Sequence, residues 1–213
     1  MTTTAASTDS IADHLADLRS QSESSPAIAR DAAWEWFRRL GRERKSDQLD
    51  ELFAMGTAPE GLDGPTDGIL VMTQIHPLAD PVINTLAAIQ MPWMGKRFDR
   101  RTHQGDNRFI GSARFPMKLL WPLYSPKESE EGTEGRLAFD FETRVEPSVD
   151  DPRTEVLVID YAPIESNPDH LIRSIRDELV EIVPGANLGK IMHRSGDGSF
   201  RNWGFFALRP RAS

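Results

Sequence analysis

The chain of 213 residues is long enough for one domain, or for one domain with a helical extension. It carries 33 acidic against 25 basic residues, a formal net charge of −8, which argues against non-specific binding to nucleic acid or to an anionic membrane. It contains no cysteine, which excludes a disulfide framework, a thiol nucleophile and a cysteine-ligated metal.

The N-terminal segment lacks the basic and apolar regions of a secretory signal. No stretch approaches the run of about 18 apolar residues that a membrane-spanning helix needs. We therefore expect a cytoplasmic protein without integral membrane association.

Residues 1–45 are predicted to form a disordered start and a helical extension, followed by a domain over residues 46–213. Ser10 is typical of a helix N-cap, and Ser25-Pro26 is typical of an N-cap with proline at the first helical position. Gly41 is the predicted stop of the second helix. The predicted helices span residues 11–19, 26–40 and 47–55.

Strand patterns dominate the rest of the chain. Leu137, Phe139 and Phe141 alternate with polar residues, the period of a strand with one buried and one solvated face. Glycines in the segment Ser195–Ser199 favour a hairpin between the two closing strands. The predicted strands are residues 69–75, 93–98, 107–113, 136–145, 155–161, 188–194 and 200–209.

Two further helices are predicted between these strands. Residues 77–90 carry apolar side chains at helical spacing. Asn167-Pro168 is a helix-opening pair, and the helix is expected to run to Val183 before Pro184-Gly185. In that helix Asp177 would lie on the polar face.

Many strands with short turns favour a sheet that closes on itself, because closure removes exposed strand edges. The predicted fold class is therefore mostly β (α+β), an antiparallel β-barrel with flanking helices. A barrel of about eight strands can hold one small ligand.

The stretch Met91-Pro-Trp-Met-Gly-Lys-Arg-Phe-Asp99 joins two aromatic residues, a glycine and two adjacent cations. It resembles the Trp-Tyr-Gly-Lys-Arg-Phe stretch of bacterial proteins with paired GXWXG and DUF4334 domains. Short blocks at 49–53, 188–193 and 204–209 resemble further blocks of those proteins in the same order, although the chain contains no Gly-x-Trp-x-Gly. The resemblance implies a lipocalin-like barrel and a hydrophobic ligand, and it supplies no catalytic residue.

Lys96 and Arg97 are adjacent in a predicted strand, so their side chains face opposite sides. An inward cation would anchor a ligand carboxylate or phosphate. Alternatively, both lie at the rim, or one pairs with an internal carboxylate. The predicted ligand-binding residues are Trp93, Lys96, Arg97, Phe139, Phe141 and Phe205.

Asp160 ends an apolar run and precedes Tyr161. An inward, desolvated Asp160 would suit an acid or base role, and a carboxylate at the barrel rim is the alternative. His193 closes a strand and is a second candidate. If the protein is an enzyme, the predicted catalytic residues are Asp160, His193 and Tyr161.

No metal or cofactor is predicted, because no His-x-x-x-His spacing occurs, although a haem would need only one histidine. Arginines interleaved with aromatic residues in the segment 97–114 could contact nucleic acid, but the acidic chain favours a solvated rim. We expect no nucleic acid partner.

These patterns predict an intracellular binding protein for a small hydrophobic or amphipathic molecule, anionic in one version, held in the barrel cavity. The alternative is a cofactor-independent isomerase, cyclase or hydratase with an acid/base pair in that cavity. A third hypothesis is a filled barrel that displays its helices to a partner. The candidate partners are thus a small hydrophobic molecule and a second copy of the chain in a homodimer.

Overall fold

The computed structural model describes residues 10–74, 93–113, 117, 121–128, 135–169 and 171–211. Three helices come first: α1 (Ile11–Ser24), α2 (Pro26–Arg42) and α3 (Ser46–Ala54). The strands are β1 (Gly64–Thr73), β2 (Trp93–Asp99), β3 (Gln104–Ile110), β4 (Lys127–Glu128), β5 (Gly135–Pro147), β6 (Glu155–Asp160), β7 (Ile175–Val183), β8 (Ala186–Arg194) and β9 (Phe200–Pro210). Two 3₁₀ helices, η1 (Gly111–Ala113) and η2 (Ile172–Ser174), precede β4 and β7.

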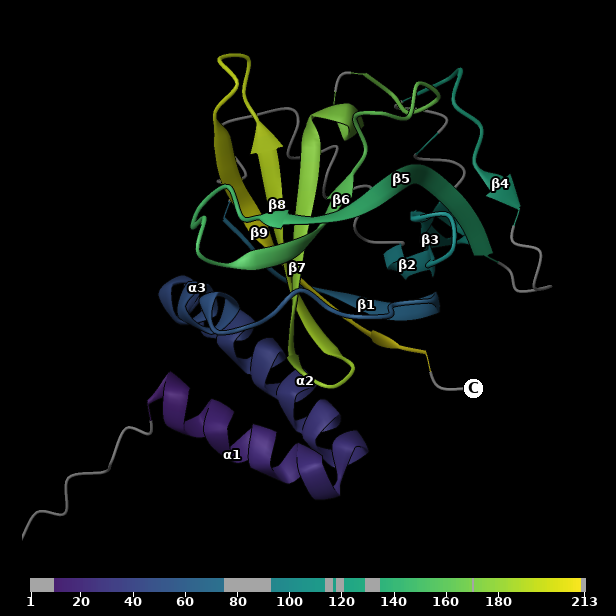
Figure 1. Ribbon diagram of the computed structural model, residues 1–213. Helices are drawn as coiled ribbons and strands as arrows, with labels where there is room; N and C mark the ends of the chain where they lie inside the picture. Colours follow the sequence, from purple (N-terminus) through teal and green to yellow (C-terminus); the bar gives the residue numbers. More distant parts are fainter. Residues whose placement is uncertain are drawn as a thin grey trace, which may run out of the picture.

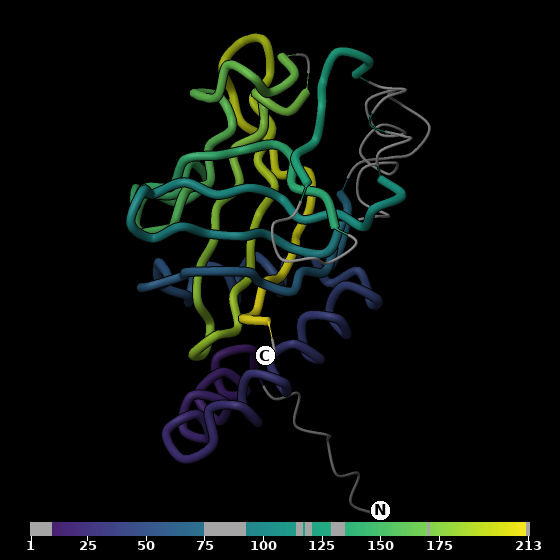
Figure 2. Tube along the Cα trace, turned by 90° about the vertical axis from the view of Figure 1, so that its right-hand side faces the viewer, coloured from purple at the N-terminus to yellow at the C-terminus, as the bar shows by residue number. Residues whose placement is uncertain are grey.

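The strands form one antiparallel sheet in the order β3-β2-β1-β9-β8-β7-β6-β5. Because β3 also pairs with β5, the sheet closes into a ring, and the short β4 pairs with β5 beside it. In both views the helices lie at the end of this barrel opposite the turn between β8 and β9 (Figures 1 and 2). The predicted fold class, a mostly β antiparallel barrel with flanking helices, is confirmed.

The helices begin where local signals predict. Ser10 caps α1, its hydroxyl oxygen accepting from the Asp13 amide at 3.1 Å, and Pro26 stands at the start of α2. The prediction that Gly41 ends α2 is wrong, because the helix continues to Arg42. A Cβ at Gly41 would lie 2.1 Å from the Val71 carbonyl oxygen, so this glycine lets α2 approach β1 closely.

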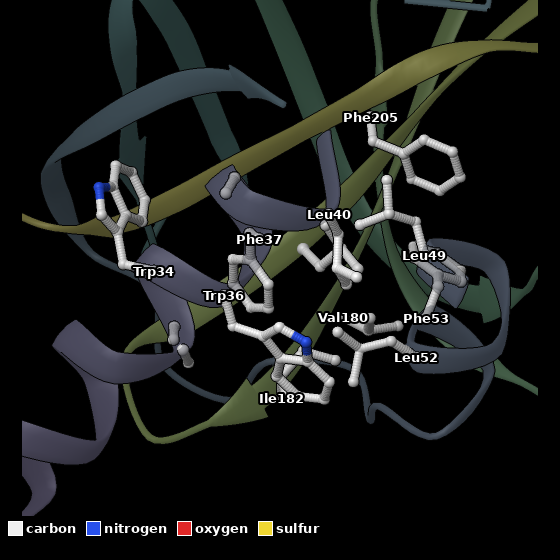
Figure 3. Packing of buried hydrophobic residues seen from close by; sticks show 14 of the residues in the cluster. Trp34, Trp36, Phe37, Leu40, Leu49, Leu52, Phe53, Val180, Ile182 and Phe205 are labelled. Carbon is white, nitrogen blue, oxygen red and sulfur yellow. The ribbon is translucent and has the colours of Figure 1, made fainter. Parts of the chain in front are cut away.

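The first of two hydrophobic cores lies between the helices and the outer face of the barrel (Figure 3). Phe37 of α2 and Leu49 and Leu52 of α3 are fully buried there. Each such side chain contributes roughly 1.5–3 kcal/mol by leaving water. From the barrel, Val180, Ile182 and Phe205 face these helices.

The second core lies in the interior of the barrel. Successive residues of a strand point to opposite faces, so Phe205 joins the outer core while Phe206 joins the inner one. The inner core is rich in aromatic side chains, namely Phe98, Phe109, Phe139, Phe141, Tyr161 and Phe206. Two cores built on the two faces of one sheet explain why several strands are apolar on both sides.

The prediction of a helix over residues 167–183 is wrong: among the described residues of this segment only η2 is helical, and β7 follows it. Pro184 and Gly185 form the two-residue turn to β8, with Val183 paired to Ala186 and Gly185 at φ +77°. Because both faces of β7 are covered, the segment lacks the polar–apolar alternation of a half-exposed strand.

Other boundaries differ by a few residues. The strands β1 and β3 begin earlier than predicted, at Gly64 and Gln104, because each is held there by a ladder to its neighbours. The predicted helix over residues 77–90 lies outside the described residues. Within the part of the chain that the structure describes, no helix has the length and apolar character to cross a membrane.

Candidate functional site

A cavity of about 90 Å³ lies inside the barrel, and the hollow measures about 600 Å³ when its solvent-filled opening is included. Its wall is mostly apolar and comes from strands all around the ring. The apolar lining residues are Leu70, Trp93, Phe109, Phe139, Ile172, Ile175, Ile191 and Phe206. The polar ones are Lys96, Asn107, Tyr161 and Asp177, which we call the Lys96 cluster.

The Lys96 cluster is a connected hydrogen-bond network. Lys96 Nζ donates to Asn107 Oδ1 at 2.9 Å, to Asp177 Oδ2 at 2.9 Å and to the Tyr161 hydroxyl oxygen at 2.5 Å. The Tyr161 hydroxyl donates in turn to Asp177 Oδ2 at 3.0 Å. All three donors of the ammonium group are therefore used, as a buried cation requires.

Strand register brings these side chains together. Lys96 of β2 is paired with Asn107 of β3, and Asp177 of β7 is paired with Ile159, two residues before Tyr161. The Asn107 amide is oriented by two neighbours, since Nδ2 donates to the Phe139 carbonyl oxygen and Oδ1 accepts from Trp93 Nε1, each at 3.1 Å. The cluster is thus fixed by the barrel itself.

Burial shifts the pKa values of Lys96 and Tyr161. Burial lowers the pKa of Lys96, and the nearby Asp177 carboxylate opposes that shift in part. Burial, followed by the charge of Asp177, raises the pKa of Tyr161 well above its usual value of about 10. Tyr161 therefore stays protonated at neutral pH and acts as a hydrogen-bond donor inside the cavity.

Aromatic rings surround the amine of Lys96. Nζ lies between 5.2 and 5.7 Å from the centres of four rings, those of Tyr161, Phe141, Phe206 and Trp93. Such rings attract a cation through their quadrupoles while they exclude water. The arrangement places an amine, a phenol and a carboxylate at one point of an otherwise apolar space.

The predicted ligand-binding residues divide into two groups. Trp93, Lys96 and Phe139 line the cavity, and Phe141 packs against the ring of Tyr161 with centroids 5.7 Å apart. Arg97 and Phe205 do not reach the cavity, which corrects their predicted position.

Arg97 and Phe205 lie outside the cavity because successive residues of a strand point to opposite faces of the sheet. Arg97 points away from Lys96 and pairs with Asp106 at 2.5 Å, with 37% of its side chain exposed. Phe205 packs under the helices, and its neighbour Phe206 takes the predicted place in the wall.

The predicted catalytic residues are not brought together. Asp160 shares the outer face of β6 with Val156 and Val158, and its carboxylate accepts from Arg144 Nη1 at 2.8 Å. His193 stacks on Trp203, with ring centroids 3.7 Å apart, and does not line the cavity. Among these three candidates only Tyr161 lines the cavity, so an acid/base pair of Asp160 and His193 is ruled out by geometry.

Sequence reasoning missed Asp177 and Asn107. The sequence pattern predicts Asp177 on the polar face of a helix, whereas in β7 it alternates inward with Ile175 and Leu179. The signal that would have found it is Pro184-Gly185 between two apolar runs, which is typical of a tight hairpin turn. No pattern in the sequence around Asn107 indicates a site, because its hydrogen bond to Lys96 depends on the pairing of β3 with β2.

In the described residues, no group of three or more histidine, cysteine, aspartate or glutamate side chains is arranged to hold a metal ion. The arginines of the segment 97–114 do not all lie on the surface. Arg108 is buried and donates to the Thr66 carbonyl oxygen at 2.8 Å. No family model, no curated protein and no solved structure matches the chain.

Proposed function

We propose that the chain binds a small, mostly apolar molecule inside the barrel, and that one polar group of this molecule meets the Lys96 cluster. The observation that carries the proposal is the convergence of four polar side chains at one point of an apolar cavity. A concave apolar site with a few convergent polar groups is the usual form of a small-molecule site.

The charges in the cavity favour a neutral polar group on the ligand. Lys96 already forms an ion pair with Asp177, at 2.9 Å, and both side chains are almost completely buried. A carboxylate or phosphate on the ligand would compete with Asp177 and add a second negative charge to a water-poor space. A hydroxyl group, which donates and accepts hydrogen bonds, or a carbonyl oxygen, which accepts them, leaves the net charge of the cavity unchanged.

Burial of the apolar body supplies the affinity in this proposal, at roughly 25 cal/mol per Å² removed from water. The enclosed space of about 90 Å³ is smaller than the ~150 Å³ apolar cavity that takes up benzene in another protein. A benzyl-sized molecule would therefore fill the enclosed part and extend into the opening, and a longer one would extend further.

Benzyl alcohol tests this proposal, with binding followed by saturation-transfer NMR. The variant Ile191→Trp fills the cavity wall, and Val145→Trp places the same side chain at an exposed position of β5. We expect benzyl alcohol to bind the unmodified chain and the Val145 variant, and to lose binding to the Ile191 variant. Equal signals from the two variants would place the binding outside the cavity.

A second candidate function is a cofactor-independent isomerase, cyclase or hydratase. It is favoured by the direct hydrogen bond between Tyr161 and Asp177, an acid and a base that line one cavity. The test is exchange of the α-hydrogens of acetophenone with deuterated water, followed by NMR. Exchange faster than in buffer, and abolished in Asp177→Asn, would support it; a rate equal to that in buffer would oppose it.

A further inference from the structure

We propose that Lys96 holds its ligand covalently, by condensing with the carbonyl carbon of a small apolar aldehyde or ketone to form an imine. This inference rests on the proposed function and names the ligand class: carbonyl compounds with an aromatic or short aliphatic body. It is carried by the position of a primary amine in the cavity wall, in contact with both a phenol and a carboxylate.

The first requirement is an uncharged amine. Lys96 has a fully buried side chain, and burial lowers the pKa of its amine, which favours the neutral form relative to an exposed lysine. The proton has a nearby acceptor, because Nζ donates to Asp177 Oδ2 at 2.9 Å. Its transfer leaves an uncharged pair, which costs less to keep buried away from water than two charges do.

The second requirement is acid–base assistance at the carbonyl oxygen. The amine nitrogen attacks the carbonyl carbon, a C–N bond forms, and the π-electron pair moves to oxygen. That oxygen takes a proton from the Tyr161 hydroxyl, which is replenished from Asp177 through their 3.0 Å hydrogen bond. The nitrogen then loses one proton to Asp177, which leaves a neutral carbinolamine beside a protonated carboxyl group.

The third requirement is the loss of water. Asp177 returns its proton through Tyr161 to the carbinolamine hydroxyl, the C–O bond breaks, and one water molecule leaves. The nitrogen lone pair forms the C=N bond, and the product is a protonated imine beside the Asp177 carboxylate. One positive and one negative charge are present before and after the reaction, so the buried ion pair of Lys96 and Asp177 is conserved.

The chain offers a matched internal control in Lys190. This lysine is also buried and ion-paired, 2.6 Å from Asp50 and 3.1 Å from Asp150, and it lies 4.8 Å from the ring centre of Phe53. It faces the helices on the outside of the barrel, where it does not line the cavity. Burial and pairing alone would therefore make both lysines equally reactive, whereas the proposed imine requires Lys96.

Benzaldehyde with sodium cyanoborohydride at neutral pH tests the proposal. Reduction traps an imine as a benzyl amine, which intact-protein mass spectrometry counts and peptide mapping locates. We expect one benzyl group on Lys96, at least tenfold faster than on Lys190 or on the exposed Lys127. Labelling of Lys190 or Lys127 at a rate that equals or exceeds that of Lys96 would overturn the proposal.

Two further measurements separate this proposal from the proposed function. Excess benzyl alcohol, which has no carbonyl group, should slow the labelling of Lys96 and leave that of Lys127 unchanged, and this experiment needs no variant. If benzyl alcohol binds the cavity but Lys96 is not trapped, the site binds its ligand non-covalently and the imine is wrong. If benzyl alcohol does not bind and Lys96 is not trapped, the proposed function fails as well.

Discussion

The hydroxyl group of Tyr161 donates a hydrogen bond of 3.0 Å to Asp177 Oδ2 inside the barrel, and Lys96 Nζ contacts both groups. Tyr161 follows β6 and Asp177 lies in β7, so adjacent strands supply the acid and the base while β2 supplies the amine. The titratable groups that line the cavity therefore contact one another at a single point.

Both tyrosines of the chain should resist ionisation at alkaline pH. Burial raises the pKa of Tyr124 to about 12 and that of Tyr161 well above 10. Because the folded pKa values are raised, their contribution to stability is complete below pH 10 and is lost as the pH rises above it. Tyrosinate absorbance should stay low at pH 10 in the native protein and rise there in guanidinium.

Tyr161→Phe leaves Tyr124 as the only tyrosine and assigns the signal that remains. Tyrosinate absorbance at pH 10 with an unchanged circular dichroism spectrum would contradict the burial of these hydroxyls.

Removing one partner of the buried ion pair should destabilise the fold strongly. Lys96→Met leaves the Asp177 carboxylate without its cation, and a loss of roughly 3–5 kcal/mol is expected from the uncompensated charge. The double variant Lys96→Met/Asp177→Leu should recover much of that loss, because two apolar side chains replace the pair. Urea unfolding of the unmodified chain, the two single variants Lys96→Met and Asp177→Leu, and the double variant gives the coupling energy.

Arg144→Ala is the control for this comparison, since the pair of Arg144 and Asp160 lies on the partly exposed outer face and should contribute at most ~1 kcal/mol. If the Lys96→Met variant is as stable as the unmodified chain, Lys96 and Asp177 do not form a pair buried away from water.

Gly189→Ala should disturb the cavity through Phe206. A Cβ at Gly189 would lie 2.2 Å from the Phe206 ring, so the ring must move. We expect a loss of about 1–3 kcal/mol in the free energy of unfolding, together with weaker binding of benzyl alcohol.

Gly196→Ala is the matched substitution, because no atom beyond the adjacent residues of the chain lies within 4 Å of the added Cβ. It should leave both unfolding and binding unchanged. If the two variants behave alike, Phe206 does not pack against Gly189 as described.

Neighbouring phenylalanines on β9 should have different effects on binding. Phe205→Leu and Phe206→Leu each remove part of a buried ring and should each cost roughly 1–1.5 kcal/mol of stability. Only Phe206→Leu should change the affinity for benzyl alcohol, because Phe205 faces the helices. A change in affinity for Phe205→Leu alone would mean that the strand is displaced by one residue.

The stability of the inner core is tested separately by Phe141→Ala. Phe141 is fully buried, and its loss should cost roughly 3–5 kcal/mol in urea unfolding. A loss below ~1 kcal/mol would indicate that the interior is hydrated around this ring.

The sequence by itself determined the features that depend on near neighbours. The N-cap at Ser10, the proline start of α2 and the closing hairpin of β8 and β9 all agree with local signals, because caps and turns are specified within a few residues. The alternation around Phe139 and Phe141 likewise indicated a strand with its aromatic side chains inward.

Only the tertiary structure decided the nature of β7 and the direction of Lys96. A strand covered on both faces has no alternating pattern, so Asp177 could not be distinguished from a residue on a polar helix face. Adjacent residues of a strand face opposite sides, and which of Lys96 and Arg97 points inward depends on pairing with distant strands. Register is a long-range property, and a change of one residue exchanges the two faces of the sheet.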